Sequence, residues 1–172
     1  MALVVFLRGA NLGNRRFKPA QLAQTLADLD VTNLGAAGTF VVRKKVAERT
    51  LRAKLQAEIP FDAPMVVCTE KEVLAALEAG ATVDAPEGTR RFATAMEKAP
   101  SPAPKLPLTA PAGSAWAVRV ALLEGRFAIG TRRPAGETGV YPNEVVEKAF
   151  KVSATTRDWP TMEKLGKLLE KG

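Results

Sequence analysis

The order of predicted elements in this 172-residue sequence indicates an α+β fold of two tandem ferredoxin-like α/β plaits followed by a C-terminal helix. In the first half, apolar β-forming runs and segments of helical period follow the order βαββαβ. In the second half the same order recurs less regularly. The stretch 80–90 has the composition of a linker, so we expect a first domain at 1–80, with an extra helix, and a second α/β plait-like domain at 81–172.

The first half contains four predicted strands and three predicted helices. Residues 3–7 form a short apolar run that ends at Arg8-Gly9, which is typical of a buried strand. Pro19 suits the first position of a helix whose leucines repeat at helical spacing. The remaining elements are a hairpin of strands at 31–36 and 38–44, a helix at 48–59, a strand at 64–69 and a helix at 70–79.

The handedness of crossover connections predicts how these strands are arranged. A right-handed crossover makes the first two strands parallel and leaves a place for the third strand between them. The loop after residue 7 and the turn at Ala37-Gly38 then leave the same end of the sheet. The basic run Arg43-Lys44-Lys45 lies at the opposite end, so we expect two separate basic clusters.

The second half is predicted from the same signals, with one weak segment. We expect strands at 91–96, 116–122, 126–131 and 152–156, and helices at 143–150 and 161–170. Five prolines between residues 98 and 111 prevent a long helix there and favour an extended segment. No residue-level repeat relates the halves, so duplication is inferred from element order alone.

Composition excludes several kinds of site. There is no histidine, and Cys68 is the single cysteine, so an internal disulfide, the common zinc sites and histidine-based acid/base catalysis are excluded. Cys68 ends an apolar run and is expected to be a buried, inert thiol. We therefore assign no catalytic residue, metal or cofactor. The sequence shows no membrane span or signal peptide, and we expect a cytoplasmic protein.

The opening loop, residues 8–18, is the best candidate for a ligand site. Glycine lets backbone N–H groups approach an anion, and arginine supplies forked donors for a phosphate or carboxylate. The formal charge of +7 permits an anionic small molecule or nucleic acid as partner but does not require one. The predicted binding residues here, together with those of the neighbouring turn, are Arg8, Gly9, Asn11, Gly13, Lys18, Gly38 and Thr39. The alternative is a glycine turn with solvated arginines.

An RNA-binding sheet is a second interpretation of the first domain. Some plaits stack bases on aromatic side chains of the two central strands, where this chain has Phe6 and Phe40. One phenylalanine on each strand is explained more simply by packing in the core. Aromatic stacking on this sheet is therefore the weaker interpretation.

A second polar motif lies near the C-terminus, in Thr155-Thr156-Arg157-Asp158-Trp159-Pro160-Thr161. Arg157 and Trp159 are predicted ligand-binding residues. The favoured alternative is a packed connection in which Asp158 or Thr161 caps a helix, Trp159 fills the core and Arg157 pairs locally.

These two motifs resemble an uncharacterised bacterial family, the domain of unknown function 1697 (DUF1697). The resemblance rests on Leu7-Arg8-Gly9-Ala10-Asn11-Leu12-Gly13 with Lys18 and Leu22, and on the motif at 155–161. It implies two plait domains and no established activity. The family commonly has Q-S-G-N where this chain has Ala36-Ala37-Gly38-Thr39, and asparagine where it has Asp158 and Pro160.

Three hypotheses follow for the function. The first is non-enzymatic binding of an anionic ligand, a nucleotide or nucleic acid, through the opening loop. The second is an enzyme with an inter-domain site, in which the opening loop and Arg157 hold an anionic substrate. The third is a structural or partner-binding module. The sequence identifies neither the ligand nor the oligomeric state, and it leaves catalysis open.

Overall fold

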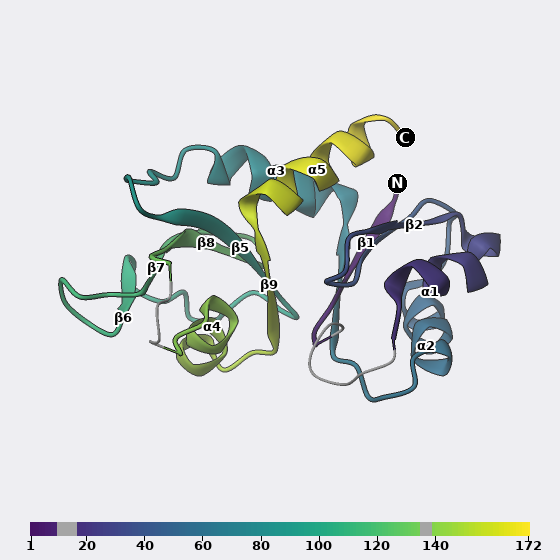
Figure 1. Ribbon diagram of the computed structural model, residues 1–172, viewed down its shortest axis with the longest axis horizontal. Helices are drawn as coiled ribbons and strands as arrows, with labels where there is room; N and C mark the ends of the chain where they lie inside the picture. The colour runs from purple at the N-terminus through teal and green to yellow at the C-terminus, as the bar shows by residue number, and fades with distance from the viewer. Residues whose placement is uncertain (10–16, 135–138) are drawn as a thin grey trace. The chain divides into compact units, whose positions relative to one another are not determined.

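The computed structural model describes residues 1–9, 17–134 and 139–172, which form a mixed α+β fold (Figure 1). This part of the chain contains two antiparallel sheets and five α-helices. The first elements are β1 (Leu3–Leu7), α1 (Pro19–Thr25), β2 (Val31–Leu34), β3 (Thr39–Val42), α2 (Glu48–Glu58), β4 (Met65–Thr69) and α3 (Glu70–Gly80). They are followed by β5 (Arg90–Met96), β6 (Leu108–Ala110), β7 (Val118–Glu124), β8 (Phe127–Arg132), α4 (Pro142–Phe150), β9 (Ala154–Asp158) and α5 (Trp159–Glu170).

The chain divides into two compact units. The first comprises Met1–Val73 with Lys167–Gly172, and the second comprises Leu74–Gly166. Helices α3 and α5 each run from one unit into the other. The expected domain boundary after residue 80 stays a prediction. Every helix in the described ranges is too short or too polar to cross a lipid bilayer.

The sheet of the first unit has the strand order β2-β3-β1-β4, with every pair antiparallel. The third strand therefore lies between the first two, as the crossover rule predicts. Helices α1 and α2 cover one face of this sheet (Figure 1). Leu22 of α1, Leu26 just after that helix, and Leu51 and Leu55 of α2 share this core with Phe40. The helical spacing of the leucines follows from this single buried face.

Backbone hydrogen bonds define the two ends of the first sheet. At one end the Leu7 N–H donates to the Gly38 carbonyl at 2.8 Å, and the Arg8 N–H donates to the Pro64 carbonyl at 2.9 Å. At the other end the Arg43 N–H donates to the Asp30 carbonyl at 3.1 Å. The prediction that the opening loop and the Arg43-Lys44-Lys45 run lie at opposite ends is confirmed.

The sheet of the second unit has the order β6-β7-β8-β5-β9. Helix α4 packs one face of it, where Val146 meets Phe92 and Val120 in a shared core (Figure 1). The proline-rich segment contains no helix and contributes the short edge strand β6, which confirms that an extended segment replaces a helix there. The register between β7 and β8 shifts between Val120 and Leu122. A Cβ at Gly130 would collide with the Arg119 carbonyl beside this bulge.

The last strand begins later than the sequence predicts. We expected it at 152–156, and it spans Ala154–Asp158. The reason is the end of α4, where Lys151 adopts a left-handed conformation with φ 53°. The residues after Lys151 turn the chain away from α4, so Ala154 is the first residue that pairs with β5, opposite Met96.

A close contact joins α3, α5 and β8 within the second unit. The indole of Trp159 is buried, and a Cβ added to Gly80 would collide with the Trp159 ring and come within 3.1 Å of Ile129. Gly80, which directly follows the helix predicted at 70–79, is the last residue of α3. Its missing side chain creates the space that the indole fills.

Replacing Gly80 with alanine is expected to destabilise the protein by about 1–3 kcal/mol, because the rigid indole has to move. Gly166→Ala is the matched control, since it also places alanine in a helix but meets only the tip of Leu77. In thermal unfolding, the melting temperature of Gly80→Ala should be lower than that of Gly166→Ala. An equal melting temperature for both variants would contradict the tight Gly80–Trp159 packing.

Candidate functional site

Arg8 and Gly9 begin the opening loop at the end of β1. Arg8 is half-buried, and Gly9 has φ 74°, a conformation that glycine adopts without strain. Gly38, across from them, has φ 80° and supplies the carbonyl that ties the turn to Leu7. The structure therefore brings Arg8, Gly9 and Gly38 together. Two predicted binding residues, Asn11 and Gly13, lie outside the described residues.

Lys18 closes the opening loop just before α1. It is exposed, and Pro19 follows it as the first residue of the helix. The preceding Phe17 packs edge-to-face on Phe61, with ring centroids 5.7 Å apart. Lys18 lines a cavity of about 240 Å³ whose polar lining also includes Gln21, Thr25 and Glu58. A cation and a carboxylate therefore share this cavity.

Thr39 and the two central phenylalanines are buried. Thr39 is 0% exposed, so its side chain does not form part of the surface of the turn. Phe40 points into the core beneath α1 and α2. Phe6 is in register with Thr39, one position away from the Val5–Phe40 pair, so it points to the opposite face and is also buried. Packing explains both rings, as the simpler interpretation predicts.

Arg157 lies on the edge strand β9 and is buried, with 6% of the residue exposed. Its Nη1 donates to Thr155 Oγ1 at 2.9 Å and to the Thr156 carbonyl at 2.8 Å, both in its own strand. Desolvation by burial lowers the pKa of the guanidinium to about 10, although the neighbouring Asp158 carboxylate partly opposes this. The guanidinium is still charged at neutral pH.

The rest of the C-terminal motif caps and packs α5. The Thr161 N–H donates to Asp158 Oδ1 at 2.9 Å, which is the geometry of a helix N-cap. Trp159 is 7% exposed, and Arg91 lies over its ring with the guanidinium carbon 5.1 Å from the centroid. The cap and the buried indole were both predicted as the structural alternative, and both are present.

A groove that the sequence did not indicate lies in the second unit. It has a volume of about 620 Å³ and runs between β6 and α4. Its walls are mostly apolar, with Leu108 and Ala110 from β6 and Val145 from α4, and Tyr141 and Lys148 add polar groups. Exposed Tyr141 before a helix was the available signal, but the short strand β6 was not predicted.

The described ranges were predicted to contain neither a metal site nor a reactive thiol. No group of three or more Cys, Asp or Glu side chains there is placed to hold a metal ion. Cys68 is buried on β4, 1% exposed, as its apolar surroundings predict.

Comparison with known proteins gives a family and a fold. The family model described as "Protein of unknown function (DUF1697)" matches residues 1–121. A solved structure, that of the conserved bacterial protein SP0830 from Streptococcus pneumoniae, is similar with a TM-score of 0.61 and 18% identity over 98% of each chain. At that identity the likeness concerns the fold alone. No curated protein matches the chain.

Arg157→Lys is expected to lower stability at neutral pH by about 1–3 kcal/mol, because an ammonium group does not reproduce the forked hydrogen bonds. Burial should lower the pKa of a lysine at position 157 below its ordinary value of about 10.4. The unfolded state then binds more protons between the two pKa values, so stability rises with pH there. In urea unfolding over a pH series, the difference in free energy of unfolding between the wild type and Arg157→Lys should shrink as pH increases. A difference in free energy of unfolding that does not change with pH would show that the ammonium group reaches solvent.

Proposed function

The chain belongs to the DUF1697 family of proteins of unknown function, and from that premise we propose that it binds an anionic ligand without catalysing a reaction on it. The ligand class is a nucleotide or nucleic acid. The site is the end of the first sheet where the opening loop begins and ends. Arg8 and Lys18 are the residues that hold the anion.

Rigid placement of two cations is the observation that carries this proposal. Arg8 follows a buried strand, and its backbone N–H is bonded to Pro64 on the neighbouring strand. Lys18 immediately precedes α1, whose Pro19 and Leu22 are buried. Both cations therefore extend from fixed elements, and a site built on rigid elements loses little conformational freedom on binding.

The neighbouring turn supplies space and no polar side chain. Gly9 has no Cβ to hinder an anion at the loop entrance. Ala36 is exposed and Ala37 half-buried, where the resemblance would place an amide and a hydroxyl. Recognition in this chain therefore depends on charge more than on hydrogen bonds from the turn, and binding should weaken steeply with salt.

We further propose that both units are α/β plaits. In the first unit, the order β1-α1-β2-β3-α2-β4 and the sheet order β2-β3-β1-β4 support this. In the second unit, β7, β8, β5 and β9 follow the same spatial order as β2, β3, β1 and β4. The first crossover there carries β6 in place of a helix, so this plait is the less regular one.

Retention on phosphocellulose at low salt tests the binding proposal. The wild-type protein should be retained and elute as salt rises, and Arg8→Ala with Lys18→Ala should elute earlier. Lys45→Ala with Arg49→Ala is the matched control, because it removes the same charge from exposed residues at the other end of the first sheet. If the wild type is not retained, or if both double variants elute alike, the opening loop is not the site.

A further inference from the structure

An arginine pair faces the same side of the second sheet at one of its ends. Arg90, the first residue of β5, is directly opposite Arg132, the last residue of β8. Arg132 is in turn opposite Val118, the first residue of β7. Directly opposed residues project to the same face, and like charges in such positions destabilise a sheet. The register therefore places two cationic side chains directly opposite each other.

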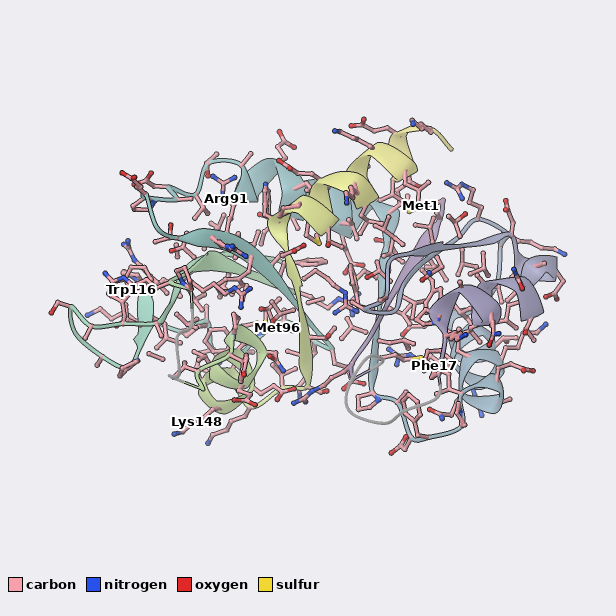
Figure 2. The ribbon with its side chains drawn as sticks, in the orientation of Figure 1. Met1, Phe17, Arg91, Met96, Trp116 and Lys148 are labelled. Atoms are coloured by element: carbon pink, nitrogen blue, oxygen red, sulfur yellow. The ribbon has the colours of Figure 1, made fainter. Side chains whose placement is uncertain are left out.

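Two further arginines lie at this end of the sheet but on its opposite face, because successive residues of a strand alternate between faces. One residue further into the sheet, Thr131 is opposite Arg91 on one side and Arg119 on the other. We call the following set the arginine cluster: Arg90, Arg91, Arg119, Arg132 and Arg133. Figure 2 labels Arg91 and Trp116, which lie apart from each other in that view.

Most of the cluster has no anionic partner in the structure. In the described part of the chain, the guanidinium groups of Arg90, Arg119 and Arg132 have no hydrogen bond or ion pair. Arg91 donates from Nη2 to the Val83 carbonyl, but its Nε is buried without a partner. A carboxylate does approach from β9, where Asp158 is in register with Phe92, but Asp158 caps α5. No described residue therefore neutralises Arg90 or Arg132.

A planar stack lies beside the cluster. The Arg133 guanidinium carbon is 4.0 Å from the centroid of the Trp116 ring. Arg133 Nη1 donates to the carbonyls of Ser114 and Trp116 at 2.8 and 3.0 Å, which holds the stack in place. Arg133 is exposed and Trp116 half-buried. Guanidinium planes and aromatic rings are both surfaces on which nucleic-acid bases stack.

We propose that this end of the second sheet binds a single strand of nucleic acid. Phosphodiesters neutralise Arg90 and Arg132, and a base stacks on the Arg133–Trp116 pair. Opposed residues on adjacent strands lie about 5 Å apart. The guanidinium groups of Arg90 and Arg132 can therefore contact one phosphate or two successive ones. Lipid headgroups and acidic peptides offer the charge but no planar base, so the stack favours nucleic acid. The proposal does not depend on the opening loop.

Fluorescence anisotropy with a labelled single-stranded oligonucleotide tests this site. Arg90→Ala with Arg132→Ala should weaken binding about tenfold or more at low salt. It should also reduce the slope of log affinity against log salt by about 1.4, at about 0.7 for each phosphate contact on a single strand. The control is Lys45→Ala with Arg49→Ala, which removes the same charge from the first unit and should retain binding.

The outcomes separate this site from the opening loop and from other anions. Loss in the Arg90/Arg132 double variant but not in Arg8→Ala with Lys18→Ala supports the arginine cluster. No binding by the wild type, or equal loss in the control, overturns the proposal. The proposal is also overturned if Arg90→Ala with Arg132→Ala loses binding to phosphatidylglycerol vesicles as strongly as to the oligonucleotide. Negative charge without a base would then be enough for binding. Quenching of Trp116 fluorescence by the oligonucleotide, absent in Trp116→Phe, is the expected sign of stacking.

Arg90→Glu should separate binding from stability. A glutamate opposite Arg132 replaces a repulsive cross-strand pair with an attractive one, so the melting temperature should rise. The same change places negative charge where a phosphate is proposed to bind, so oligonucleotide affinity should fall. Calorimetry and anisotropy on one preparation test both effects. A variant that binds as well as the wild type would overturn the site even if it were more stable.

Discussion

Burial on both faces of the central strands is the constraint on which the rest of this structure depends. In the first sheet, β1, β3 and β4 are almost wholly buried, and in the second sheet the same is true of β5 from Phe92 onward and of β8 up to Thr131. A charged side chain within such a strand loses its hydration unless a partner compensates. Cations are therefore confined to strand ends and edge strands. Arg8, Arg90 and Arg132 all occupy strand ends.

Arg157 shows what happens when an arginine lies within a buried strand. Its guanidinium bonds to its own strand, and desolvation lowers its pKa to about 10. Arg90 and Arg132, at strand ends, are exposed and half-buried respectively, and they lack described partners. The same residue type is thus structural inside a strand and available at its end. Burial and position, more than residue type, separate these roles.

The sequence predicted much of the fold because apolar periodicity and proline act locally. All four strands and three helices of the first half were expected, and the prolines between residues 98 and 111 correctly excluded a helix. The strand β6 was missed because its three residues are stabilised by pairing with β7, which is a non-local interaction. The later start of β9 was missed for a related reason, since the left-handed Lys151 gave no clear signal.

The candidate sites were harder to predict because they depend on register. Arg132 follows the strand predicted at 126–131, and only pairing with β5 places it opposite Arg90. A shift of one residue would send these side chains to opposite faces. At the C-terminal motif, by contrast, the cap is local. Asparagine and aspartate cap helices about equally well, so the cap made by Asp158 is compatible with the asparagine that the resemblance places there.

The absence of a helix in the segment before β7 also explains the groove in the second unit. In the first unit, α1 and α2 together cover one face of the sheet. In the second unit, α4 packs on one face, and the proline-rich segment adds β6 at the sheet edge. One helix covers less of a five-stranded sheet than two cover of a four-stranded one, so a channel remains between β6 and α4. Substitutions that break the proline pattern would therefore alter the groove before they altered the Arg90–Arg132 pair, because β5 and β8 pair with each other and not with β6.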